Sequence, residues 1–141
     1  MKEDEDLLHS VKRELQEETG VKDIFLKKTE LYDAIKRDPR GRVVSVAFLA
    51  LINADQPLRA DSDAKVAKWF PVSALPKLAF EHNRIIEDAL RHLRFEIQTT
   101  NIAYQILPKK FTLSQLQELY EEILEKELDK RNFRKRIKEL D

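Results

Sequence analysis

The sequence contains no cysteine and only two glycines in 141 residues. Without cysteine it cannot form disulfides, thiolate zinc sites or cysteine nucleophiles, and it suits a reducing cytoplasm. Average usage would give about ten glycines, so the glycine-rich loops of P-loop and dinucleotide-binding proteins are excluded. Long apolar runs are also missing, since residues 43–52 fall well short of the roughly 20 residues that a membrane helix needs. We therefore expect a cytoplasmic protein with no membrane partner.

Charge is balanced in number but not in position. Twenty-six lysines and arginines match twenty-six aspartates and glutamates, so no net field attracts a polyanion. Residues 118–127 hold five glutamates against one lysine, whereas residues 129–138 hold six lysines or arginines against one aspartate. Any contact with nucleic acid must therefore come from this local clustering.

The patterns over residues 1–97 predict one α+β domain. Apolar residues at helical spacing predict a helix over 6–19, with an aspartate at its start and Gly20 as its stop. Two strands are predicted over 24–35 and 43–52, joined by the turn sequence Asp-Pro-Arg-Gly. A third strand is predicted over 66–72, with Trp69 packed in the core, and a second helix over 80–95.

Residues 98–141 are predicted to form a separate helical domain. Thr112 or Ser114 is placed to cap a helix that runs to Leu124. A further helix is predicted from Asp129 to Leu140, after a short connection over 126–128. Two short helices joined in this way predict a helix-turn-helix.

Three carboxylates are crowded on the first predicted helix. Glu14 and Glu18 are four residues apart and share one face, with Glu17 beside them. Like charges at this spacing repel unless a cation lies between them, and Mg²⁺ or Mn²⁺ prefers such oxygen ligands. A solvated acidic face explains the spacing equally simply, and on spacing alone it is the favoured interpretation.

The segment RELQEETGV at residues 13–21 resembles the second half of the Nudix box. The resemblance implies a partial Nudix-like α/β/α sandwich that hydrolyses nucleoside diphosphates linked to another group. It also implies Mg²⁺ or Mn²⁺ bound by Glu14 and Glu18, with Glu17 binding metal or orienting water and Arg13 holding the carboxylates. The glycine of the first half of the box would precede Met1, so we expect the chain to be part of a longer protein.

Three further segments are similar to Nudix-related transcriptional regulators of the NrtR type. They are residues 33–52, 69–82 and 106–124, the last continuing into LDKRNFRKRI. This resemblance implies a sensor domain followed by a winged helix whose wing is missing. It further implies binding of double-stranded DNA, an ADP-ribose-type metabolite or a sugar as effector, and a homodimer.

Two basic clusters are candidate binding sites. Arg37, Arg40 and Arg42 surround the predicted turn, where a solvated hairpin tip is the plain interpretation and the resemblance adds a ligand-binding role. The last helix carries the predicted DNA contacts Lys130, Arg131, Asn132, Arg134 and Lys135. The alternative there is a solvated basic helix paired with the preceding glutamate-rich helix.

Three functions remain open at this point. The leading hypothesis is an NrtR-like regulator that senses a nucleotide-sugar-type metabolite. The competing one is a Mg²⁺-dependent pyrophosphatase acting on ADP-ribose or a related nucleoside diphosphate, favoured by Arg13, Glu14, Glu17 and Glu18 together. The third is an interaction module in which these residues are only structural.

Overall fold

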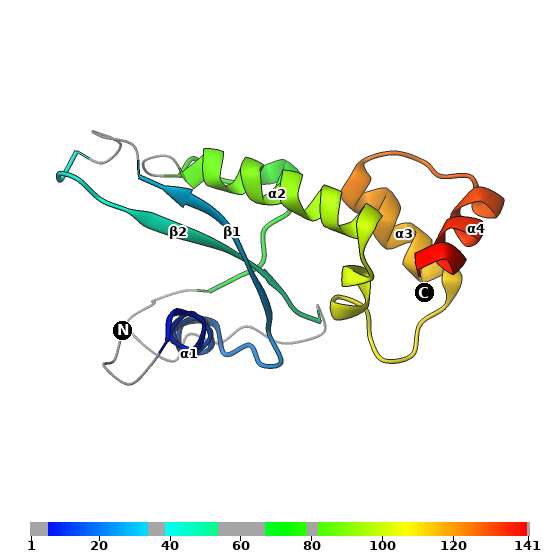
Figure 1. Cartoon of the computed structure of the whole chain (residues 1–141), viewed down its shortest axis with the longest axis horizontal. Helices are drawn as coiled ribbons and strands as arrows, with labels where there is room; N and C mark the ends of the chain where they lie inside the picture. Colours follow the sequence, from blue (N-terminus) through cyan, green and yellow to red (C-terminus); the bar gives the residue numbers. More distant parts are fainter. Residues whose placement is uncertain (1–5, 34–38, 54–66, 79–81, 141) are drawn as a thin grey trace.

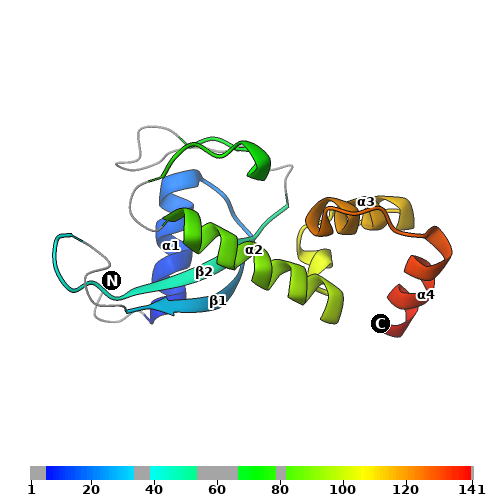
Figure 2. The same ribbon diagram turned by 90° about the horizontal axis from the view of Figure 1, so that it is seen from above.

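The computed structural model describes residues 6–33, 39–53, 67–78 and 82–140. At one end of the molecule a β-hairpin lies between two helices, and at the other end two shorter helices pack together (Figure 1). Seen from above, the long helix α2 runs from the hairpin to the helical end (Figure 2). The elements are α1 (Leu7–Thr19), β1 (Phe25–Tyr32), β2 (Ser45–Leu51), η1 (Val72–Ala74), α2 (His82–Thr99), η2 (Ile102–Gln105), α3 (Leu113–Leu124) and α4 (Lys130–Leu140). This arrangement confirms the predicted α+β class.

Both ends of α1 follow from the sequence. The Asp6 side chain caps the helix by accepting a hydrogen bond of 2.8 Å from the backbone N–H of His9. Gly20 ends the helix in the left-handed conformation with φ of 75°, and its N–H donates to the carbonyl of Gln16 at 2.7 Å. The predicted start and stop are confirmed.

The two strands form an antiparallel hairpin with α1 and α2 on opposite sides (Figures 1 and 2). Phe25 lies opposite Leu51 and Tyr32 opposite Ser45, with an irregularity in the register between Lys28 and Leu31. The strands are shorter than predicted at both ends. They form the sheet layer of a partial α/β/α sandwich.

The predicted third strand is wrong for the residues that the structure describes. Residues 67–71 have no regular secondary structure and lead into η1. Pro71 lacks a backbone N–H and cannot donate to a strand ladder. Trp69 is 57% exposed rather than packed in the core, which corrects that assignment.

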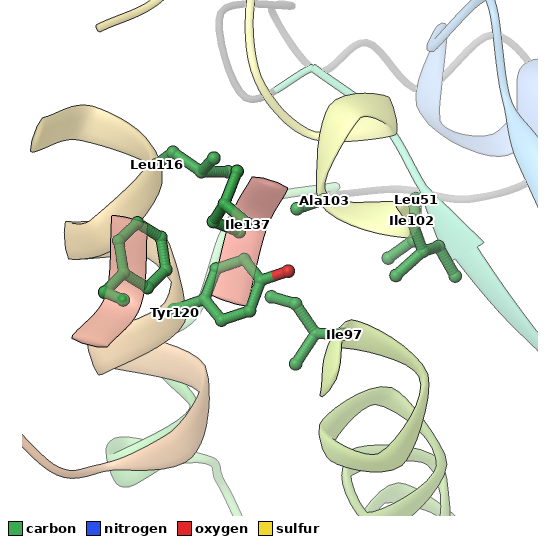
Figure 3. Close-up of a cluster of buried hydrophobic side chains, with 8 residues drawn as sticks. Leu51, Ile97, Ile102, Ala103, Leu116, Tyr120 and Ile137 are labelled. Carbon is green, nitrogen blue, oxygen red and sulfur yellow. The ribbon is translucent and has the colours of Figure 1, made fainter. Parts of the chain in front are cut away.

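Helix α2 extends four residues beyond its predicted end, so the predicted domain boundary at residue 97 falls within it. The reason is apolar packing, because Ile97 is fully buried against the helical end of the molecule. The residues of this buried cluster are Leu51, Ile97, Ile102, Ala103, Leu116, Tyr120, Phe133 and Ile137 (Figure 3). The rings of Tyr120 and Phe133 meet edge to face, with centroids 5.1 Å apart.

The helix-turn-helix is confirmed, and its caps are specific. Thr112, rather than Ser114, caps α3 in a reciprocal capping box with Gln115. Asp129 lies just before α4 and its carboxylate accepts from the N–H of Asn132 at 2.9 Å. Among the described helices, none is long and apolar enough to cross a membrane.

Candidate functional site

The surface of α4 divides into a buried side and a basic side. Phe133 and Ile137 are 5% and 7% exposed and pack into the buried cluster. The five predicted contact residues are all exposed. Together with Asp129 and Lys138 they line one shallow surface hollow; they are Lys130, Arg131, Asn132, Arg134 and Lys135. The fold therefore brings the whole predicted set together.

Sequence reasoning missed Lys138 as a member of this basic face. Lys138 is exposed and lines the same hollow as Arg131 and Arg134. The available signal was spacing, because Lys138 follows Arg134 by four residues and Arg131 by seven, and such residues share a helix face. Arg136, by contrast, does not line this hollow and turns toward α2.

The glutamates of α3 do not neutralise α4. Among the residues that the structure describes, no ion pair joins a glutamate of α3 to a cation of α4. Glu121 instead accepts a hydrogen bond from the N–H of Leu128 at 3.0 Å, and Glu125 pairs with Arg94 at 3.5 Å. The basic face is thus left available to a polyanion such as a phosphate backbone.

The connection between α3 and α4 is held by side chains of α3. Gln117 donates through Nε2 to the carbonyl of Leu128 at 2.9 Å. Glu125 adopts a left-handed conformation with φ of 54°, which ends α3. These contacts fix the turn and hence the direction in which α4 leaves it.

On α1, the predicted arginine and two of the predicted carboxylates interact. Arg13 donates through Nη1 to both carboxylate oxygens of Glu17, at 3.2 and 3.3 Å. Its Nη2 lies 4.0 Å from Oε1 of Glu14. Glu14, Glu17 and Glu18 are all exposed. Arg13 therefore holds carboxylates, as the Nudix resemblance implies.

The same three carboxylates do not converge on one point among the described residues. Within the described ranges, no three acidic, histidine or cysteine side chains gather into a group that could hold a metal ion. Both carboxylate oxygens of Glu17 accept a hydrogen bond from Arg13. Carboxylate oxygens are the kind of ligand that Mg²⁺ or Mn²⁺ prefers, but here they are not arranged around one point. Metal binding by Glu14, Glu17 and Glu18 stays a prediction.

The structure describes two of the three arginines predicted around the turn between the strands. Arg40 and Arg42 are exposed on either side of Gly41, which has φ of 134° and marks the bend. Arg37 lies outside the described residues. The ligand-binding role of these three arginines stays a prediction.

Comparison with known families decides which proteins this chain is related to. Residues 1–90 match the NUDIX domain, and residues 103–141 match the NrtR DNA-binding winged helix domain. The chain belongs to the Nudix family. The order of the two matches confirms the resemblance to NrtR-type proteins.

Two curated proteins are similar to this Nudix chain. Over 139 residues it is 32% identical to the ADPR responsive transcriptional repressor NtrR of Acinetobacter baylyi, covering 97% of the chain and 56% of that protein. Over 82 residues it is 42% identical to the ADP-ribose pyrophosphatase of Methanocaldococcus jannaschii, covering 58% and 48%. The chain thus spans about half the length of these relatives.

Solved Nudix structures share the fold. Shewanella oneidensis NrtR has a TM-score of 0.81 at 30% identity, covering 99% of this chain and 67% of that one. The same protein complexed with a 27mer DNA gives 0.78 at 28%, covering 96% and 63%. A MutT/nudix family protein from Enterococcus faecalis gives 0.83 at 27%, covering 99% and 65%.

Proposed function

We propose that this Nudix protein is a transcriptional regulator that binds double-stranded DNA through α4 and senses a nucleotide-sugar-type metabolite such as ADP-ribose. The observation that carries the proposal is the exposed basic face of α4, set on a buried apolar side within a helix-turn-helix. The relatives support it, since one is named an ADPR responsive repressor and another was solved with DNA.

The contacts of α4 divide by chemistry. In helix-turn-helix proteins the first turns of the second helix meet base edges in the major groove. Asn132 is suited to adenine and Arg134 to guanine, each through two hydrogen bonds worth roughly 1–3 kcal/mol of discrimination. Lys130, Arg131 and Lys135 have the charge that phosphate contacts require.

The remaining parts of the proposal follow from this role. Arg37, Arg40 and Arg42 are proposed to bind the anionic effector at the hairpin tip. Because operators read by helix-turn-helix proteins have two-fold symmetry, we propose a homodimer. A regulator acts where the DNA is, so we propose a cytoplasmic location.

Fluorescence anisotropy tests DNA binding, with duplexes selected for binding from a randomised pool. Replacing both Arg131 and Arg134 by alanine should weaken binding at least about tenfold at moderate salt. The control is Lys28→Ala, which removes an exposed cation from β1 and should leave binding unchanged. If the double variant binds as well as the unaltered protein, the face of α4 is only a solvated surface.

A second candidate function is Mg²⁺- or Mn²⁺-dependent hydrolysis of ADP-ribose. It is favoured by the contact of Arg13 with Glu17 and by the similarity to an ADP-ribose pyrophosphatase. Arg13 and Glu17 would be its catalytic residues, with Glu14 and Glu18 as metal ligands. The test is release of AMP from ADP-ribose in the presence of Mg²⁺. Release that Glu17→Gln abolishes, from a protein extended through the first half of the Nudix box, would support hydrolysis. No release from that extended protein would leave sensing alone.

A further inference from the structure

Helix α2 is bound to the hairpin by three polar pairs on one of its faces. The hydroxyl of Tyr32 donates to Oδ2 of Asp88 at 2.6 Å. One helical turn later, Nε2 of His92 lies 3.0 Å from Oε1 of Glu30. After a further turn, Glu96 forms an ion pair with Lys27. The spacing of four residues on α2 places all three pairs along β1, so α2 is fixed to the Nudix domain over most of its length.

The far end of α2 belongs to the helix-turn-helix. Ile97 is completely buried in the cluster with Leu116, Phe133 and Ile137. Nε of Arg94 donates to the carbonyl of Ile123 at 2.9 Å, and its Nη2 lies 3.5 Å from Glu125. The last four carbonyls of a helix lack donors within the helix, and a cation stabilises that end. Arg94 therefore caps the C-terminal end of α3, whose last turn has no basic residue of its own.

A second arginine makes the corresponding contact between α4 and α2. Nη2 of Arg136 donates to the carbonyl of Gln98 at 3.3 Å, in the last turn of α2. Arg136 also lines a cavity of about 280 Å³ between the end of α2 and α4, with Gln98 and Asn132 among the other lining residues. Arg136 is one of the six cations of residues 129–138, but it faces α2 and does not line the surface hollow of the other five.

We propose that Arg94 and Arg136 are positioning residues that fix the angle of the helix-turn-helix against α2, and through α2 against the Nudix domain. Each arginine caps the C-terminal end of a helix other than its own: Arg94 of α2 caps α3, and Arg136 of α4 caps α2. The apolar cluster holds these helices together without direction, whereas hydrogen bonds to defined carbonyls set the angle between them. The role assigned to α4 rests on the proposed DNA-binding function.

A distance between two spin labels changes when this angle changes, and the labels attach only where they are wanted because the chain has no cysteine of its own. Labels at Lys28→Cys on β1 and Glu139→Cys on α4 report the distance between the Nudix domain and α4. Changing both Arg94 and Arg136 to alanine should broaden the distance distribution while the protein stays folded by circular dichroism, since the apolar cluster is intact. The matched control changes Arg84 and Lys135 to alanine, which removes two exposed cations from the same two helices and should keep the distribution narrow. An unchanged distribution in the first variant would overturn the proposal.

Salt dependence separates positioning from phosphate contact. With calf-thymus duplex DNA as probe, Lys135→Ala should reduce the slope of log K against log salt by about 0.9, as loss of one phosphate contact does. Arg136→Ala should leave that slope unchanged. In the distance measurement, Arg136→Lys keeps a donor, so it should give a narrow distribution where Arg136→Ala gives a broad one. A slope that falls in Arg136→Ala as in Lys135→Ala would make Arg136 a DNA contact and the proposal wrong. If the unaltered protein binds no DNA, the proposed function fails while the distance measurement still decides the positioning role.

Discussion

The two ends of the molecule bury their apolar residues to very different extents. At the helical end, one cluster draws side chains from α2, η2, α3 and α4, with Leu51 of β2 as its one member from the hairpin, and each is at most 7% exposed. At the hairpin end Val21 and Tyr32 are buried, but more of the large apolar side chains remain in contact with solvent than at the helical end, where Phe95 and Leu113 are exposed. Those at the hairpin end include Leu31 at 56%, Val44 at 55%, Trp69 at 57% and Phe70 at 45% exposed.

The difference in burial follows from the two architectures. Short amphipathic helices that cross one another close a core locally, because each contributes one apolar stripe. A sheet of two strands is narrow even with a helix on each face, so among the described residues it leaves part of its apolar surface uncovered. Stability should therefore be concentrated in the helical end, and the following predictions probe that contrast.

The largest effect is expected in the helical core. Leu116 is 1% exposed, and Leu116→Ala should lower the free energy of unfolding by about 2–5 kcal/mol through lost burial and a cavity. Urea unfolding followed by circular dichroism measures this loss. Trp69→Ala, which truncates a larger side chain, should cost less than about 1 kcal/mol because Trp69 is 57% exposed. Equal losses in the two variants would break the contrast.

A smaller effect is expected where the hairpin meets α2. Burial, together with the hydrogen bond to Asp88, raises the pKa of Tyr32 to about 12 from its ordinary value of 10.0. Since the folded state holds this proton more tightly, the stabilisation is complete below pH 10 and is lost between about pH 10 and 12. Tyr32→Phe should cost about 1 kcal/mol at neutral pH and should remove this alkaline loss. Unfolding measured across that pH range checks both points, and an unchanged alkaline loss in the variant would exclude Tyr32 as its source.

A comparable or slightly smaller effect is expected at the end of α1. Gly20 has φ of 75°, a conformation that alanine adopts only with strain. Gly20→Ala should therefore lower stability by about 1 kcal/mol. Gln16→Ala, one turn earlier on the exposed face of α1, is the control and should change stability by less than about 0.5 kcal/mol. Thermal denaturation of the two variants tests the role of the left-handed stop.

The sequence predicted correctly those features of the fold that depend on residues close together in the chain. The stop at Gly20, the cap at Asp6, the cap at Thr112 as one of two candidates, and the helix-turn-helix all rest on residues close together in the chain, and the structure confirms them. The third strand and the burial of Trp69 were wrong because a strand requires a partner that composition does not reveal.

Long-range contacts explain what else was missed. The extension of α2 depends on Ile97 reaching a cluster most of whose members, such as Leu51, Tyr120 and Phe133, are far from it in the sequence. The different roles of Arg136 and Lys135 depend on the carbonyl of Gln98, and no charge pattern within α4 distinguishes the two. At the acidic helix, the Nudix segment indicated that Arg13 holds carboxylates, but not that both oxygens of Glu17 would be engaged.

The smallest effect is expected from divalent metal at α1. The carboxylates of Glu14 and Glu18 are exposed and not gathered, so Mn²⁺ should bind weakly. Its concentration would then reach only about Kd in practice, where a single-site ligand stabilises the fold by about 0.4 kcal/mol. Calorimetric titration with Mn²⁺ should give heats that Glu18→Gln abolishes. Glu122→Gln, which removes an exposed carboxylate from α3, should leave them unchanged. Equal heats in the unaltered protein and Glu18→Gln would mean that the acidic face of α1 is only solvated, and the two ends would then differ in packing but not in metal affinity.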